Sequence, residues 1–148
     1  MEEYLKLAVL EAQEGLKNND GGPFGAVIIK DGRIVSKAHN CVLKENDSTA
    51  HAEVMAIRKA SQELKTYDLT GCIIISSSEP CPMCLSAIVW SNIKEVYYGT
   101  TKDEVGKIGF RDDLIYEFLK GNNELLNLKH LDNKESQELL NDYQNIIY

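Results

Sequence analysis

The sequence lacks the features that mark several large classes of protein. Its 148 residues include only three prolines and ten glycines, and 43% are apolar, a composition that excludes collagen-like, low-complexity and disordered chains. No stretch approaches the roughly 18 apolar residues that a membrane-spanning helix needs. The first four residues are acidic rather than basic, and no apolar signal core follows them. We therefore expect a single cytoplasmic domain, residues 1–148, without a membrane partner.

Clustered basic residues are also absent. Sixteen Lys and Arg stand against 23 Asp and Glu, which gives a formal net charge of −7. Residues 101–148 alone hold six basic and ten acidic residues, a net charge of −4. Proteins that bind nucleic acids usually carry a basic stripe. The sequence thus favours a small-molecule or protein partner, and no nucleic acid is expected.

Cysteines are few, and their placement is uneven. Cys41 and Cys72 stand alone, whereas Cys81 and Cys84 lie three residues apart. In an intracellular chain such residues are more often thiols or metal ligands than disulfides. We predict structural roles for the two single cysteines and for His39 and His130.

Apolar periodicity predicts alternating helices and strands. Helices are expected over residues 2–17, 49–65, 80–91, 113–119 and 133–147, and strands over 24–30, 33–39, 72–76 and 95–99, with a weaker strand over 125–131. Asp31-Gly32 predicts a tight turn between the first two strands. This order indicates an α/β fold, a three-layer α/β/α sandwich around a mixed five-stranded sheet that begins with an antiparallel hairpin.

Two short motifs at predicted helix starts carry the chemistry. His51-Ala52-Glu53 opens the second helix, and Cys81-Pro82-Met83-Cys84 opens the third. Cysteines three apart on a helix share one face, and a helix N-terminus favours thiolates. With the imidazole of His51 they make a three-ligand zinc set, which leaves the fourth tetrahedral position open for water. Glu53 fits less simply, because two helical steps turn it about 200° away from His51. The two converge only if the metal lies beyond the helix end.

The two motifs together form the H-x-E…P-C-x-x-C signature of zinc nucleobase and nucleoside deaminases. Residues 21–28, 49–54, 79–90 and 109–113 further resemble bacterial guanine deaminases of the cytidine deaminase superfamily. The resemblance covers roughly residues 5–120, and the last thirty residues match poorly apart from a terminal tyrosine. It implies one zinc ion per chain, held by His51, Cys81 and Cys84. It also implies hydrolysis of a free purine base, guanine to xanthine and ammonia, by zinc-activated hydroxide with Glu53 as the proton carrier.

The resemblance implies a set of further site residues. Asp113 would assist proton transfer, with Asp112 left open as the alternative. The substrate would contact Phe24, Asn40, Trp90, Phe110 and Tyr148. In the resembled family the terminal tyrosine closes the site from an exchanged C-terminal segment, which predicts a homodimer that exchanges residues 121–148. Whether Tyr148 acts on its own subunit or on the partner stays open.

Several alternatives compete with this interpretation. A thioredoxin-like oxidoreductase also places CxxC at a helix start, but this chain has no proline after Pro82, and His51 and Glu53 would have no role. A structural zinc module would need a fourth ligand, Cys41 or Cys72. Among deaminases, the alternatives are a tRNA adenosine deaminase, which the acidic C-terminal region disfavours, and an enzyme for cytosine or another amino-purine, pterin or aminotriazine.

Overall fold

The protein, described over residues 1–148 by a computed structural model, is built on a mixed four-stranded sheet. Strand β1 (Gly25–Lys30) pairs antiparallel with both β2 (Arg33–His39) and β3 (Cys72–Ser78), and β4 (Glu95–Thr100) runs parallel to β3. The strand order is β2-β1-β3-β4. In the predicted turn, Asp31 and Gly32 have φ of +50° and +73°, as a type I′ hairpin requires.

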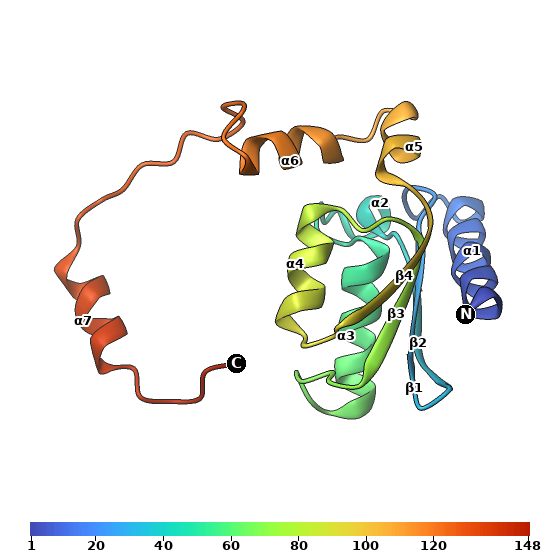
Figure 1. The fold of residues 1–148 in the computed structure, drawn as a ribbon, viewed down its shortest axis with the longest axis horizontal. Helices are drawn as coiled ribbons and strands as arrows, with labels where there is room; N and C mark the ends of the chain where they lie inside the picture. Colours follow the sequence, from blue (N-terminus) through green and yellow to red (C-terminus); the bar gives the residue numbers. More distant parts are fainter.

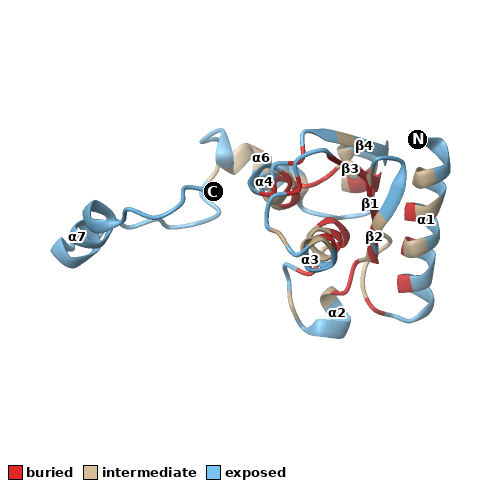
Figure 2. Ribbon diagram, turned by 90° about the horizontal axis from the view of Figure 1, so that it is seen from below, coloured by how far each residue is buried: buried red, intermediate tan, exposed pale blue.

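Helices cover both faces of the sheet (Figure 1). Helix α1 (Glu2–Lys17) lies on one face, and α3 (Ala52–Leu64) and α4 (Pro82–Trp90) lie on the other. Strand β1 is buried on both sides because its alternate residues serve two cores: Val27 and Ile29 pack with α1, and Ala26 and Ile28 pack with α3 and α4. Figure 2 shows the buried residues gathered along these inner surfaces.

The prediction of a fifth strand over residues 125–131 is wrong. This segment has no strand partner and lies in a tail that leaves the sheet after α6 (Asp112–Leu119) (Figure 1). Leu128 and Leu131 are 80% and 83% exposed. A strand needs a neighbouring edge for its hydrogen bonds, and the tail passes none.

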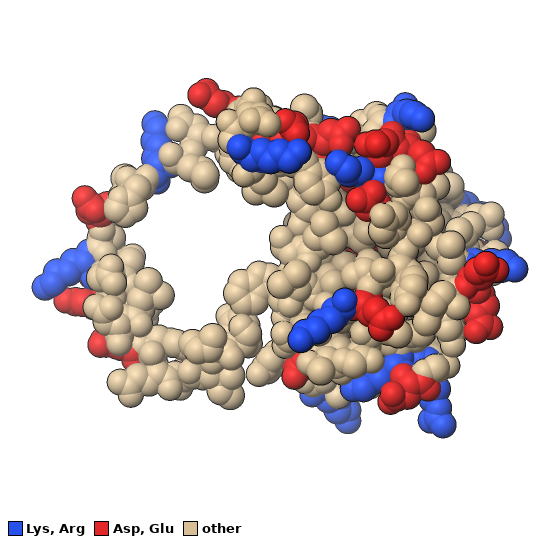
Figure 3. Space-filling view, in the orientation of Figure 1, with Lys and Arg blue, Asp and Glu red and all other residues tan.

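The C-terminal tail, residues 121–148, contains no buried residue (Figure 2). Its helix α7 (Lys134–Asp142) is shorter than the predicted 133–147 and ends before the apolar Ile146 and Ile147. Figure 3 shows an opening between the tail and the remainder of the molecule. No helix combines the length and apolar character that crossing a bilayer requires.

Two short helices were not predicted: α2 (Val42–Glu45) and α5 (Lys102–Lys107). The sequence does contain a signal for α5, because Thr101 and Glu104 form a capping box, each accepting a hydrogen bond from the other's backbone N–H. Helix α5 matters for the site because it begins the segment that carries Phe110 and Asp112.

Candidate active site

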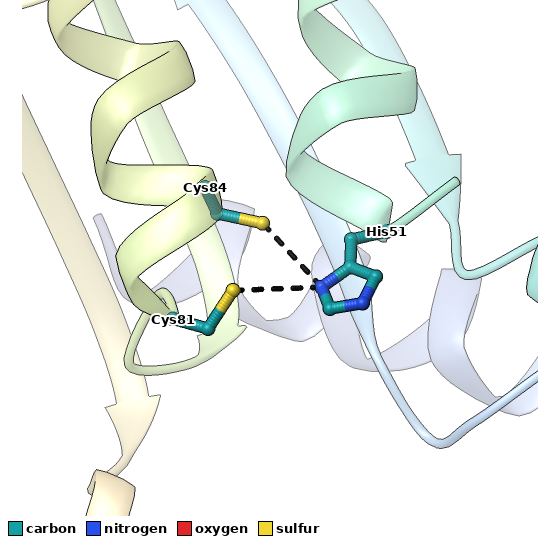
Figure 4. Close-up of side chains that lie close together, drawn as sticks. All are labelled: His51, Cys81 and Cys84. Atoms are coloured by element: carbon teal, nitrogen blue, oxygen red, sulfur yellow. Dashed lines mark hydrogen bonds between the residues drawn. The ribbon is translucent and has the colours of Figure 1, made fainter. Parts of the chain in front are cut away.

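The site forms where the N-termini of α3 and α4 meet (Figure 4). His51 and Cys81 are the N-cap residues of these helices, with extended backbone at φ −67° and ψ 155° and 167°. Neither side chain caps its own helix. Both instead point toward the space between the helices, where Cys84 also points from the first turn of α4.

The three side chains have the separations of a zinc ligand set. His51 Nδ1 lies 3.6 Å from the Sγ atoms of both Cys81 and Cys84. Ligands at Zn–S and Zn–N distances of about 2.3 and 2.0–2.1 Å and a tetrahedral angle would lie about 3.6 Å apart. The donor set therefore fits zinc. Cys41 and Cys72 do not join this group, so no cysteine supplies a fourth ligand.

The two cysteines differ in their affinity for a proton. The hydrogen bond from Cys84, together with that from His51, lowers the pKa of Cys81 to about 4. The same contact with Cys81, followed by burial, raises the pKa of Cys84. Cys81 is therefore the more acidic thiol of the pair, and zinc binding requires both thiols to lose their protons.

Glu53 lies beside the ligands without being one of them. Its side chain is buried, its Oε1 accepts a hydrogen bond of 2.9 Å from Ser76 Oγ, and its Oε2 lies 3.3 Å from Cys84 Sγ. Burial raises the pKa of this carboxyl above its ordinary value. His51 precedes the helix and has an extended backbone, so helical periodicity does not relate it to Glu53. The predicted separation of 200° around the helix axis therefore does not apply.

A cleft opens over His51, Cys81 and Glu53. Three residues predicted to contact the substrate line this cleft: Phe24, Asn40 and Phe110. The full lining is Phe24, Asn40, His51, Glu53, Glu79, Cys81, Val105, Phe110 and Asp112. Phe24 and Phe110 meet edge to face, with ring centroids 4.9 Å apart. Asn40 is buried, and its Oδ1 accepts a hydrogen bond from the Val42 N–H at 3.1 Å.

Three predicted site residues lie outside this cleft. Asp113 is exposed, and its neighbour Asp112 lines the cleft instead. Trp90 ends α4, eight residues or about 12 Å of helix beyond Pro82. Tyr148 packs on Trp90, with ring centroids 5.9 Å apart, and not on the zinc ligands of its own chain.

Residues 1–100 match the family described as the cytidine and deoxycytidylate deaminase zinc-binding region. The match covers the His51 and Cys81–Cys84 motifs that the structure brings together. The chain belongs to this zinc-binding deaminase family. His51, Cys81 and Cys84 form its zinc site.

Individual deaminases are similar over most of their length. Guanine deaminase of Bacillus subtilis is 51% identical over 116 residues, 78% of this chain and 74% of that protein. The tRNA-specific adenosine deaminase of Aquifex aeolicus is 41% identical over 107 residues, 72% and 70% of the two chains. The crystal structure of guanine deaminase from Bacillus subtilis superposes with a TM-score of 0.91 at 40% identity, covering 99% of this chain and 97% of that one.

Sequence reasoning missed two residues of this deaminase cleft, Glu79 and Val105. Glu79 directly precedes the Pro80-Cys81 motif, and its Oε2 accepts a hydrogen bond of 2.8 Å from the Lys102 N–H at the start of α5. Its place in the motif was the available signal. Val105 carried none, because α5 itself was not predicted.

Proposed function

We propose that this zinc deaminase hydrolyses guanine to xanthine and ammonia. The observation that carries the proposal is the likeness to the Bacillus subtilis guanine deaminase structure, which includes the C-terminal tail as well as the zinc site. A cleft that combines two aromatic rings, an amide and three carboxyl groups suits a flat base with several hydrogen-bonding positions.

Asn40 supplies the selectivity for guanine. Because its Oδ1 accepts from the Val42 N–H, the amide nitrogen is the end left to donate to a ligand. Guanine presents two acceptors, O6 and N7, on one edge, whereas adenine presents N7 beside a donor amine. A donating amide therefore favours guanine over adenine.

Glu53 is the proton carrier in this proposal. Zinc, when bound, supplies a nucleophile at neutral pH because it lowers the pKa of coordinated water to about 7. Ser76 holds Oε1 of Glu53, and Cys84 has no proton to donate once it is a ligand, so Oε2 is free to accept one from water. The raised pKa of Glu53 lets the same carboxyl hold that proton and deliver it to the base ring or the departing amine.

Asp112 is one of three carboxyl residues that line the cleft, with Glu53 and Glu79, and we assign it the role predicted for Asp113. Burial and the nearby negative charge of Cys81 raise its pKa. It therefore also holds a proton more readily than an exposed aspartate does. Asp113 faces solvent at the same helix start and has no comparable contact with the cleft.

We also propose that two copies exchange their tails and that Tyr148 closes the partner's cleft. The tail leaves the body after α6 and meets it again at Tyr148, while the apolar side chains of Leu139, Leu140 and Ile147 stay 73–85% exposed. Tyr148 lies at the far end of α4 from the zinc ligands of its own subunit. A second copy supplies both the missing cover and a cleft for the tyrosine to close.

The function is tested by ammonia release from guanine, adenine, cytosine, guanosine and tRNA, with purified zinc-loaded protein. We expect guanine to be deaminated fastest and xanthine to be the product. Asn40→Asp, which replaces the donating amide by acceptors, should raise the KM for guanine while zinc stays bound; exposed Asn46→Asp is the control. Faster conversion of adenosine in tRNA would overturn the proposal in favour of RNA editing.

A further inference from the structure

His39, at the end of β2, lies between two carboxylates outside the zinc site. Its Nδ1 is 3.2 Å from Glu11 Oε2 of α1, and its Nε2 is 2.8 Å from Asp20 Oδ2 in the loop after α1. The side chains of His39, Glu11 and Asp20 are only 15%, 19% and 9% exposed. Gly15 makes room for the ring, because a Cβ at that position would lie 2.8 Å from His39 Cδ2.

Each of the two carboxylates that His39 contacts also has a lysine beside it. Lys37 lies 3.2 Å from Glu11, and Lys44 lies 3.7 Å from Asp20. The two ring nitrogens of His39 face different carboxylates, so one imidazole bridges α1 and the loop that follows it. Hydrogen bonds to an ionised acceptor such as a carboxylate are the stronger class, so the contacts of this ring restrain the segments that it joins.

The segments that His39 joins are two walls of the cleft. Asp20 lies in the loop that leads from α1 to Phe24, and Asn40 directly follows His39. The Asn40 N–H donates to the Phe24 carbonyl at 3.0 Å. The loop also lies directly against Asn40, because a Cβ at Gly21 would fall 2.0 Å from its Oδ1.

Asp20 is anchored to the second wall through its backbone as well. Its carbonyl accepts hydrogen bonds of 3.0 Å from the N–H groups of Leu43 and Lys44 in α2. The loop that carries Phe24 is therefore joined to the segment of Asn40 by two sets of contacts. One is the His39–Asp20 contact, and the other is the pair of hydrogen bonds from α2 to the Asp20 carbonyl. A shift of either segment would change the distance between the aromatic wall and the donating amide.

We infer that His39 is a positioning residue for base binding, which acts through Asp20 and Glu11 to fix Asn40 against Phe24. The inference rests on the proposed function in that the base is taken to be guanine. His39 does not line the cleft and touches neither the substrate nor the zinc ligands. Its effect therefore falls on substrate affinity and leaves the chemical step to Glu53.

The first test compares His39→Gln with Arg33→Gln, an exposed position at the opposite end of the same strand. Loss of the contacts with Glu11 and Asp20 should raise the KM for guanine about tenfold, with kcat within about threefold, because hydrogen bonds to a carboxylate are stronger than those between neutral groups. Zinc content should not change, and Arg33→Gln should match the wild type. An unchanged KM in a folded, zinc-loaded His39→Gln protein would overturn the inference.

A second measurement does not depend on the substrate. Hydrogen exchange of the Asn40 amide, which is bonded to Phe24, should be about tenfold faster in His39→Gln, since local opening becomes easier when its support is lost. An unchanged exchange rate at Asn40 contradicts the positioning role even if guanine proves not to be the substrate. Conversely, faster exchange with no activity on guanine would refute the proposed function alone.

Asp20→Asn extends the test without removing the ring. It should raise KM in the same direction, and the double variant should show no further rise, because both residues act through one contact. Additive effects would mean that His39 does not act through Asp20. If His39→Gln fails to fold, Asp20→Asn and its amide exchange decide the question.

Discussion

The body of the protein, residues 1–120, and its tail, residues 121–148, differ in how far their side chains are buried. All 33 buried residues lie between Ala8 and Val105, whereas the tail buries none. The zinc ligands and Glu53 lie at the starts of α3 and α4, and Ser76 of strand β3 donates a hydrogen bond to Glu53. The body alone thus holds the zinc ligands and Glu53 in position. The tail, by contrast, leaves apolar side chains exposed that a second surface could cover.

The largest effect should come from removing a metal ligand in the body. Cys84→Ala is expected to abolish zinc binding and to lower guanine turnover by at least about 10⁴-fold, because two ligands hold the ion poorly and no activated water remains. Zinc analysis and ammonia release measure both. Cys72→Ala is the matched control: Cys72 is also buried but lies at the start of β3, outside the zinc site, so this variant should keep its zinc. Activity in zinc-free protein would contradict the assignment.

Glu53→Gln separates the proton carrier from the ligands. The amide keeps the shape and the contact with Ser76 but cannot carry a proton, so kcat should fall about 10²–10⁴-fold while zinc stays bound. Glu63→Gln, exposed near the other end of α3, should behave as the wild type. Near-normal turnover of Glu53→Gln would assign the proton transfers to another group.

Deleting residues 143–148 tests the tail while the body stays intact. Turnover should fall about tenfold to a hundredfold because the cleft is left open to water, and zinc content should not change. Mixed dimers then show whether the tail acts on its own subunit or on the partner. A Glu53→Gln chain with its tail is combined with a tail-deleted chain that keeps Glu53. Recovered activity indicates that the tail acts on the partner. Absence of recovery in verified mixed dimers would place its action on its own subunit.

The smallest effect on catalysis should come from weakening the tail's contact surface. Leu139→Ser and Leu140→Ser each replace an exposed apolar side chain of α7, and burial of a leucine contributes about 1.5–3 kcal/mol. Dimer dissociation, measured by sedimentation, should shift about tenfold to a hundredfold per substitution. Turnover at high protein concentration should change little. Glu135→Gln on the same helix is the control, and a dimer unaffected by the leucine changes would contradict tail exchange.

The sequence predicted the body far better than the tail. Helix α1 and strand β2 have the predicted bounds, because their burial follows one period along the chain. Spacing and donor chemistry made a three-ligand zinc set feasible, and the resemblance to zinc deaminases identified His51, Cys81 and Cys84 as its members. Residues 125–131 were mistaken for a strand since their apolar pattern suits one, and only the three-dimensional path reveals that no edge is within reach.

Convergence of Glu53 with His51 could not be derived from helical spacing. It depends on the backbone of His51 being extended, a conformation that the sequence does not specify by itself. The choice between Asp112 and Asp113 had the same difficulty, because adjacent residues at a helix start point in different directions and the loop before them sets which one faces the cleft. Asp112 does so here.

The absence of a fifth strand has a consequence for handling the protein. Strand β4 has a sheet partner on one side only, and most of its residues are exposed, Tyr97 and Tyr98 among them. An unpaired edge of β-branched and aromatic residues is a template on which further strands assemble. During concentration or partial unfolding, β4 is therefore the expected starting point of aggregation, and a lysine in place of Tyr97 or Tyr98 is the change that should improve storage without touching the cleft.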